Sequence, residues 1–510
     1  MHGYSSMLPA SASAPAAAER AVAAEAERIV RAEDGRETGR ARRRARREAL
    51  REEMRHLARE ERERKAAAAK AGEERQRLAA AGLRKSMLDR IRERGAACGG
   101  NVTEKVFAAV PDPRDPRGVR HSLASVLALV LMAMTSGCTT LIAVTCWIAA
   151  ADQELLAAAG ARVLPDGTRT APCGRTVSRL LALAGPDITD ACVCRYLAGG
   201  DRALQAAGHG QDQDQREQGS PAGEEPEGEE EGRAPALMPQ VVSDGKYVRG
   251  ARRPDGTTLI LLSAATPGGV TLAQREIPPE TKEVTQIGPM LRELDEYYPL
   301  AGHVLTADAL HTTEDFADLA CDLGAGAVLT VKDNQPTLRA ALENALWAPA
   351  AVHVTRDKGH GRAETRSHLV MDAPEEVKTL FPPAEQVSRV VRTRTVTCWL
   401  SDGHTRTRVT RTGTETVYLI ITMPAREAPP EHIAVYIRRH WSIENRVHHV
   451  RDVTLREDSS QVKTGSRPRV LVSLRNLSTG LIRQSGHDKI AATLRGAGHD
   501  NDLLLAITRL

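Results

Sequence analysis

A change of pattern at Pro239 limits the possible folds of this chain more strongly than any other feature of its sequence. From there the chain reads as three short β-rich runs, joined by turns at Asp255-Gly256 and Gly268-Gly269. Helical spacing then alternates with two further apolar runs, HVLTADA and AVLTVKD. This order predicts a mixed α/β domain built on a five-stranded sheet with helices.

Three acidic residues, far apart in the sequence, stand where their side chains can converge. Asp244 ends a β-branched run, Asp308 closes the run HVLTADA, and Glu444 lies in YIRRHWSIENRVHHVRDV, a segment that favours a helix. A cluster of carboxylates suits Mg²⁺ or Mn²⁺, because these ions prefer oxygen ligands. Two such ions bridged by carboxylates activate water against a phosphodiester.

Each of these acids also has a plainer interpretation. Asp244 precedes Gly245, and Asp-Gly is a common turn pair. Asp308 could cap the following helix, although Thr312 and Thr313 are better placed to do so. The role of His311 stays open. Glu444 has acidic rivals in the same region: Glu431, Asp452, Glu457 and Asp458.

A family resemblance rests on six short sequence motifs that occur in this order: DGK, TADALHT, VLTVKDNQPTL, HGRAETR, HWSIEN and DVTLRED. They resemble the bacterial insertion-sequence transposases of the DDE group, specifically the H-repeat-associated (ISAs-type) family. The resemblance runs from about Asp112 to about Arg495 and leaves out the first hundred residues and an acidic insert. Three strands followed by alternating helix and strand is also the order of the RNase H-like fold, in which the first acid lies on strand one and the second ends strand four.

The resemblance implies a catalytic and metal-binding role for Asp244, Asp308 and Glu444, with two Mg²⁺ or Mn²⁺ ions. It implies metal-dependent cleavage at insertion-sequence ends and attack of the freed 3′-hydroxyl on target DNA. The partner is double-stranded DNA, and a homodimer is expected because two ends must be brought together. The expected location is the bacterial cytoplasm, with the nucleoid. The predicted DNA contacts are Lys246, Lys332, Asn334, His360, Arg362, Arg438 and Arg451.

Two alternatives to this function stay open. One is a metal-dependent nuclease of the same fold without strand transfer, and the other is a decayed or domesticated DNA-binding protein without catalysis. The chain departs from the family where it has His448-His449 in place of His-Trp, and Leu455 in place of Phe. The segments around Asn334 and His360 could also be ordinary loops, with Asn334 as a helix cap.

Between residues 351 and 423 the helical rhythm is lost and the sequence alternates as strands do. This predicts a β-rich insertion before the helix of Glu444. The alternation places several arginines on one face, which suits a DNA backbone. These arginines are Arg362, Arg366, Arg392 and Arg394.

Composition divides the rest of the chain. Residues 1–97 are rich in Ala, Arg and Glu, and they predict a partly helical or disordered extension. Its basic run from Arg40 to Arg47 is either a solvated face or a contact to DNA phosphate. The further predicted parts are a small all-α domain at 98–205, an acidic low-complexity linker at 206–236, a catalytic domain at 237–485 and a helical tail at 486–510. The helices near the C-terminus are expected to be amphipathic and to pack under the sheet.

The stretch from Ser122 to Ala151 contains no charge, yet it does not predict a membrane span. It is broken around Gly137, and each apolar piece is shorter than the roughly 20 residues that a span needs. Two buried helices with a turn are expected. Eight cysteines in 510 residues do not form a disulfide framework, so reduced thiols are expected, with structural zinc at Cys192 and Cys194 a minor alternative.

Overall fold

The computed structural model describes residues 84–208, 236–253, 255–359, 362–401 and 406–510, together with Ala24 and Gly82; for 398–401 and 406–408 it describes the backbone alone. The chain divides between Ser86 and Met87, and the fold below is that of the second unit. Most of the predicted charged extension, with its run from Arg40 to Arg47, lies outside the described residues. The same holds for most of the acidic linker.

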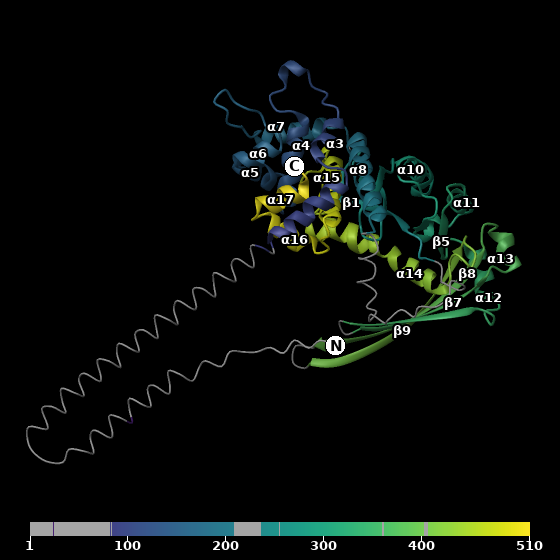
Figure 1. Cartoon of the computed structure of the whole chain (residues 1–510). Coiled ribbons are helices and arrows are strands. Elements are labelled where there is room, and N and C mark those ends of the chain that lie inside the picture. Colours follow the sequence, from purple (N-terminus) through teal and green to yellow (C-terminus); the bar gives the residue numbers. More distant parts are fainter. Residues whose placement is uncertain are drawn as a thin grey trace, which may run out of the picture. The chain divides into compact units, whose positions relative to one another are not determined.

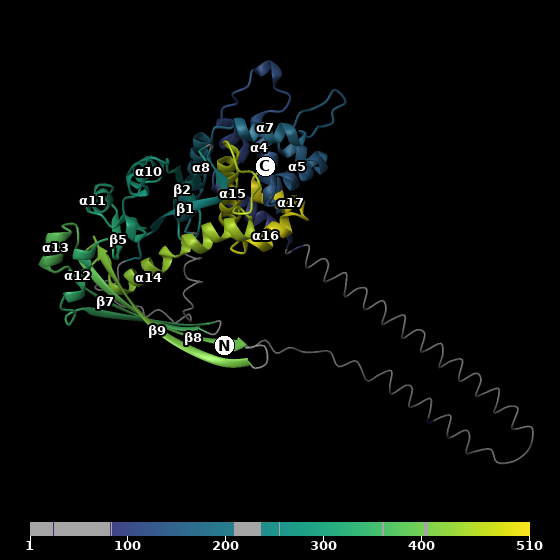
Figure 2. The ribbon, with the colours of Figure 1, turned by 180° about the vertical axis from the view of Figure 1, so that it is seen from behind.

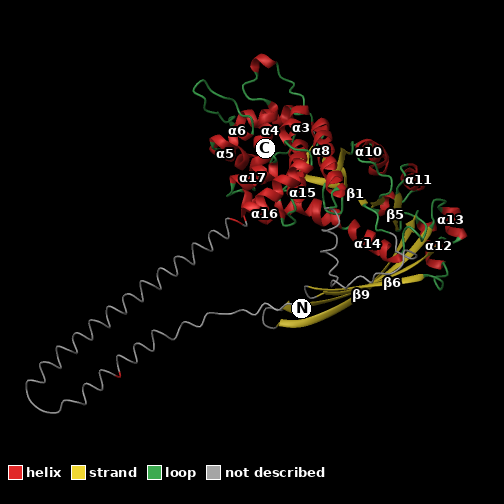
Figure 3. Cartoon of the chain, viewed as in Figure 1, coloured by secondary structure: helices red, strands yellow, loops and turns green. Residues whose placement is uncertain are grey.

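A layer of helices forms the first part of this unit (Figure 3). The two helices predicted on either side of Gly137 are confirmed, and Gly137 turns the chain with a positive φ of 88°. Ser122 and Thr140 cap their N-termini by accepting from Ser125 N–H and Ala143 N–H. No helix among the described residues is both long and apolar enough to cross a bilayer. The layer comprises α3 (Val102–Lys105), α4 (Leu123–Thr135), α5 (Leu141–Ala150), α6 (Gln153–Ala158), α7 (Gly174–Leu183) and α8 (Pro186–Ala206).

The strands of the described residues form one mixed sheet, in the order β3-β2-β1-β4-β5-β9-β8-β7-β6. Strands β1, β4 and β5 are parallel, and the remaining pairs are antiparallel. The strands are β1 (Gln240–Arg252), β2 (Thr258–Ala265), β3 (Thr271–Glu276), β4 (Val304–Ala307), β5 (Gly326–Val331), β6 (Ala351–Gly359), β7 (Arg362–Asp372), β8 (Gln386–Ser401) and β9 (Arg406–Ile421).

The predicted sheet of five strands is therefore only the first part of a nine-stranded one. The insertion does not form a separate layer, because β9 pairs along β5 from Val328↔Ile421 to Val331↔Tyr418. Without β9, the edge of β5 would present unpaired backbone groups, which folded proteins avoid leaving exposed. The insertion also contains a short helix, α13 (Glu375–Leu380), that the sequence pattern did not predict.

Helices cover both faces of the central strands. On one face, Ile433 and Tyr436 of α14 (Pro430–His440) pack against Val304 and Val328. The alternate residue Leu305 belongs to the main core, together with side chains of α10 and α11. Figure 2 shows α14 leading from the sheet toward the helical layer. The helices of the other face are α10 (Glu283–Tyr297), α11 (Glu314–Asp322) and α12 (Pro336–Asn344).

Helix α15 (Arg467–Gln484) is buried all round from Pro468 to Gln484, so the prediction of an amphipathic helix is wrong here. It lies among the helices α4, α7 and α8 (Figure 1) and packs on them. Its Val472 contacts apolar residues of β1 and β2. Two of its buried arginines have acidic partners, Arg469 with Asp190 of α8 at 2.8 Å and Arg475 with Glu457 at 3.3 Å, whereas Arg483 donates to the carbonyl of Gly269. Two further helices, α16 (Ile490–Ala497) and α17 (Asn501–Thr508), complete the described chain.

Candidate metal centre

Parallel pairing brings Asp244 and Asp308 to the same level of the sheet. Ser243 of β1 is the register partner of Ala307 of β4, so the next residues of both strands are adjacent. Val242 packs against Ile443, and Asp244, two residues on, faces the same way. Asp308 ends its strand and caps a short 3₁₀ turn by accepting from Ala309 N–H at 2.7 Å.

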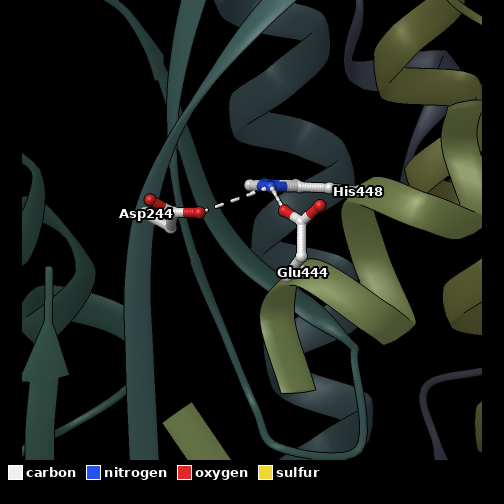
Figure 4. Close-up of side chains that lie close together, drawn as sticks. All are labelled: Asp244, Glu444 and His448. Atoms are coloured by element: carbon white, nitrogen blue, oxygen red, sulfur yellow. Dashed lines mark hydrogen bonds and ion pairs between the residues drawn. The ribbon is translucent and has the colours of Figure 1, made fainter. Parts of the chain in front are cut away.

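The helix that begins as α14 continues as two π-helical segments, Ile443–His448 and Val450–Thr454. The first of them presents Glu444 and His448 to the sheet on one face, four residues apart. His448 Nδ1 lies 3.3 Å from Glu444 Oε2 and 3.4 Å from Asp244 Oδ2. Figure 4 shows the imidazole between the two carboxylates. One ligand atom from each residue falls within 4.8 Å of the other two.

Asp308 stands beside this trio and is not part of it. Its carboxylate is half-exposed, and Lys332 Nζ approaches Oδ1 at 3.6 Å. Asp308 nevertheless contributes to the electrostatics of the trio, because its charge helps to raise the pKa of Asp244. The structure thus brings together two of the three predicted acids with a histidine, and it places the third acid next to them.

The charge states of the trio follow from burial and neighbours. Burial, followed by repulsion from Glu283, raises the pKa of Asp244 to about 7, and Asp308 and Glu444 add to the rise. Burial, together with Arg451 and Lys246, lowers the pKa of His448 to about 3, so this imidazole is neutral at pH 7. A neutral imidazole offers a lone pair to a metal ion, and crowded carboxylates gain when a cation relieves their repulsion.

These residues fit a divalent cation of the Mg²⁺ or Mn²⁺ type. Asp244, Glu444 and Asp308 supply oxygen, which both ions prefer. The Nδ1 atom of His448 lies against both Asp244 and Glu444, so this is the ring nitrogen that could join the two carboxylates as a ligand. Asp244 would shed its proton on binding such an ion, because carboxylate ligands bind in the ionised form.

Two predicted DNA contacts are buried instead. The Lys246 side chain is 7% exposed, and its ammonium lies 2.6 Å from Asp452. Arg451 is 1% exposed and forms an ion pair with Glu457 at 2.6 Å. Neither cation is available to a DNA phosphate in this arrangement, contrary to prediction. Each long side chain instead balances an acid that the sequence offered as a rival of Glu444.

The other predicted contacts lie at the surface or outside the described residues. Lys332 is exposed beside Asp308, and the exposed Asn334 donates its amide to Ala309 O at 2.8 Å, which holds the Asp308 turn. Arg438 is 57% exposed and pairs with Asp357. Arg362 lies 3.5 Å from Glu364. His360 is not among the described residues.

The arginine face of the insertion is only partly positive. Register places Arg366 opposite Arg392 and Glu364 opposite Arg394, so the predicted arginines do share one face. The carboxylate of Glu364, 1% exposed, pairs with Arg362, Arg366 and Arg392. Arg394 and Arg411 line a shallow hollow on the same face, beside these internal pairs.

Sequence reasoning missed two residues of the site. In the sequence, His448 is notable only because His448-His449 stands where the resembled family has His-Trp. Its position beside Asp244 depends on how the helix meets the sheet, which no local pattern shows. Glu283 stood unremarked at the start of a helix, and only the folded chain shows its carboxylate above Gly245. No local pattern around Glu283 marks it, because its contacts, with Gly245 and with His311, are distant in the sequence.

Comparison with known proteins gives two family matches and several relatives. Residues 250–481 match the family described as "Transposase DDE domain", and residues 104–197 match that described as "DDE_Tnp_1-associated". Asp308 and Glu444 lie inside the first interval, and Asp244 lies six residues before it.

Two relatives from Escherichia coli illustrate the similarity. "Putative transposase YncI" of strain O157:H7 is 27% identical over 252 residues, which cover 48% of this chain and 61% of the relative. "H repeat-associated putative transposase YhhI" of strain K12 is 22% identical over 278 residues, or 52% of this chain and 70% of the relative. The similarity to YncI therefore spans less than two thirds of that relative.

Proposed function

This chain belongs to the bacterial DDE transposase family that includes the H repeat-associated proteins, and from that membership we propose that it cuts and joins DNA. It would cleave at the ends of an insertion sequence and transfer the freed 3′-hydroxyl to target DNA. The central part of the sheet, with helices on both faces, would be its RNase H-like catalytic core.

One observation carries the proposal: Asp244 and Glu444 lie within reach of one another and Asp308 lies beside them, although the three acids come from three distant segments. The register Ser243↔Ala307 aligns Asp244 with Asp308, and the π-helical segment Ile443–His448 brings Glu444 within reach of Asp244. Burial, then the charge of Glu283, then the charges of Asp308 and Glu444 raise the pKa of Asp244. Groups with such a perturbed pKa gather at functional sites.

The protein residues hold and orient the reacting groups. Asp244, Glu444 and Asp308 would hold Mg²⁺ or Mn²⁺, with His448 beside the first two. When bound, these ions lower the pKa of water and stabilise charge on the phosphate. The half-exposed Asp308 and its neighbour Lys332 face solvent, so a DNA phosphate can approach Lys332 without any rearrangement of the core.

DNA would extend from this edge across exposed cations. Arg438 of α14 and the arginines around the hollow of the insertion, Arg394 and Arg411, are candidates for contacts to phosphate. Because both ends of an element must be cut in one complex, the active form would be a homodimer on DNA. The charged N-terminal extension and the acidic linker, at 1–97 and 206–236, would lie outside the catalytic domain.

The test is cleavage of a duplex that carries the element's terminal sequence, with Mg²⁺ or Mn²⁺. Asp308→Ala and Asp244→Asn should each lower the cleavage rate at least about a hundredfold, because each removes a ligand from the metal centre. Asp333→Ala is the matched control, since Asp333 is an exposed acid in the loop after β5 and pairs with Arg339. This control should cut like the unmodified protein.

The products separate the alternatives. Cut ends joined to a second duplex support a transposase, whereas cut ends alone indicate a nuclease without strand transfer. Binding of the terminal duplex without cleavage by either metal would indicate a DNA-binding protein that has lost catalysis. Cleavage that survives both Asp244→Asn and Asp308→Ala would place the chemistry elsewhere and contradict the proposal.

A further inference from the structure

Glu283, the first residue of α10, lies directly against the strand that carries Asp244. A Cβ atom built at Gly245 would collide with its carboxylate. Asp244 and Gly245 are neighbours on β1, so their side-chain directions point to opposite faces of the sheet. Asp244 faces the π-helical segment of Glu444, and Glu283 therefore supports the same point of β1 from behind.

The same carboxylate also reaches the segment that carries Asp308. Its Oε1 atom lies 2.9 Å from Nε2 of His311, the last residue of the 3₁₀ turn that Asp308 caps. The His311 side chain is fully buried, so this hydrogen bond is shielded from water. The charge of Glu283 is also the largest electrostatic influence on Asp244 after burial.

We propose that Glu283 and His311 form a positioning pair, which fixes the turn of Asp308 against the strand of Asp244 and so sets the spacing of the two aspartates. The pair touches no ligand atom of the trio Asp244, Glu444 and His448; it acts through Gly245 and through the turn. Residues that orient metal ligands from behind commonly control metal affinity. This inference rests on the proposed function, because it concerns the aspartates that would hold the metal.

The role of Gly245 follows from the same contact. Any side chain at this position would occupy the place of the Glu283 carboxylate, so glycine is required for close approach rather than for its backbone freedom. Gly245→Ala should therefore displace Glu283 without removing it. The two substitutions Gly245→Ala and Glu283→Ala should then affect the same interaction and combine non-additively.

The experiment measures the dissociation constant of Mn²⁺ by titration calorimetry on the full chain, with thermal unfolding in chelator as a check on folding. Glu283→Ala should weaken Mn²⁺ binding about tenfold, the lower end of the range for residues behind metal ligands. Gly245→Ala should weaken it by a similar factor. The double variant should bind no more weakly than Gly245→Ala alone, because the added methyl group then has room beside the shortened side chain.

Two further variants sharpen the result. Glu283→Gln keeps an oxygen that can accept from His311 Nε2–H, so its Mn²⁺ affinity should stay within about threefold of the unmodified protein. Gly288→Ala is the control on the same helix, because its added Cβ would approach no closer than 3.4 Å to Arg292 and 3.6 Å to Leu319. That control should leave the affinity unchanged.

Three outcomes would overturn the inference. Independent, multiplying effects of Gly245→Ala and Glu283→Ala would show that they do not share one contact. Equal losses in Glu283→Gln and Glu283→Ala would show that the charge itself acts on the metal. Lower melting temperatures with unchanged Mn²⁺ affinity would show a purely structural pair. An unmodified protein that binds no Mn²⁺ at all would instead overturn the proposed function and the inference with it.

Discussion

Glu457 shows how single side chains in this protein depend on their partners. It is 1% exposed and accepts hydrogen bonds from Arg451 and Arg475, both buried. Burial opposes its ionisation, yet the two arginines outweigh burial and lower the pKa of Glu457. The buried acid is therefore ionised at neutral pH, and it compensates two cations that have no access to water.

Glu457→Ala should lower the free energy of unfolding by about 3–5 kcal/mol, because it leaves buried charges without a partner. Urea denaturation at pH 7 measures this change. Glu376→Ala, at an exposed position of α13, is the control and should change stability by less than about 0.5 kcal/mol. A loss below about 1 kcal/mol for Glu457→Ala would mean that the arginines find other partners.

Asp201 of α8 should make stability fall as pH rises. Its carboxylate accepts from Tyr298 Oη–H at 2.9 Å and from Gln205 Nε2–H at 2.7 Å, and burial raises its pKa to about 6 from 3.8. The folded state thus binds more protons than the unfolded state between about pH 4 and pH 6. The stabilisation is complete below about pH 4 and is lost as pH rises through about 6.

Asp201→Asn removes this ionisation. At pH 7 the variant should exceed the unmodified protein in free energy of unfolding by on the order of 1 kcal/mol, and near pH 4 the difference should vanish. Urea denaturation across this range provides the measurement, with the exposed Asp318→Asn as control. A difference that is the same at both pH values would rule out titration of Asp201 as its source.

The sequence could place individual acids but not their surroundings. Local patterns and the family resemblance together suggested Asp244, Asp308 and Glu444, and it was the resemblance that selected Glu444 among its acidic rivals; Asp244 was expected where a strand ends but lies inside β1. Whether a cation is free depends on distant contacts, so Lys246 looked available to DNA although Asp452 binds it 206 positions away. His448 and Glu283 were not predicted from the sequence, because their contacts in the site also come from distant segments.

At the scale of elements, the ribbon of β7, β8 and β9 places a buried acid among the arginines of one face. The buried Glu364 neutralises part of the positive charge of Arg362, Arg366 and Arg392. Burial opposes its ionisation, but the hydrogen bond from Arg392 and the nearby arginines keep the pKa of Glu364 below its usual range. The ribbon is therefore less positive than its arginines alone suggest.

Glu364→Gln should strengthen binding of a random DNA duplex and steepen its salt dependence by about one unit of slope, because one more phosphate can be neutralised. Fluorescence anisotropy at several salt concentrations measures both quantities. Glu376→Gln changes the net charge equally, away from this face, and should have a smaller effect. Equal effects of the two variants would mean that the ribbon does not contact DNA.

Sequence periodicity predicted which segments form strands and helices, but it did not predict which elements pair or pack with one another. The first five strands and the helices between them were predicted from alternation and turn residues. The sequence did not predict that the insertion joins the same sheet, because β9 pairs with β5 across about 90 residues, as in Leu329↔Ile420. Burial of α15 was missed because Arg469, Arg475 and Arg483 give it the composition of a surface helix.

At the scale of the whole molecule, α15 joins the helical layer to the sheet. It packs on α4, α7 and α8, and Val472 contacts Val248 and Leu261. The ion pair between Arg469 and Asp190 lies at the same junction. Neither layer could lose α15 without losing part of its own core, so both should unfold together.

Single-tryptophan variants test this cooperativity. Trp147 reports on α5 of the helical layer, and Trp347, which donates to Leu342 O after α12, reports on the sheet. Their fluorescence should give melting temperatures that agree within about 2 °C, as expected of a cooperative transition. Transitions separated by more than about 5 °C would show that the two layers unfold as independent units.

The β8–β9 hairpin is long, and its length can be estimated from its strand pairing. Each strand has 16 residues, paired from Gln386↔Ile421 to Ser401↔Arg406 (Figure 1). At about 3.3 Å per residue the hairpin extends for roughly 50 Å, which is about one and a half turns of a DNA duplex. Removing two residues from each strand would shorten it by one pleat repeat and keep every remaining side chain on its face. The length of this hairpin can therefore change in evolution, while the register of β1 on β4, which aligns Asp244 with Asp308, stays as it is.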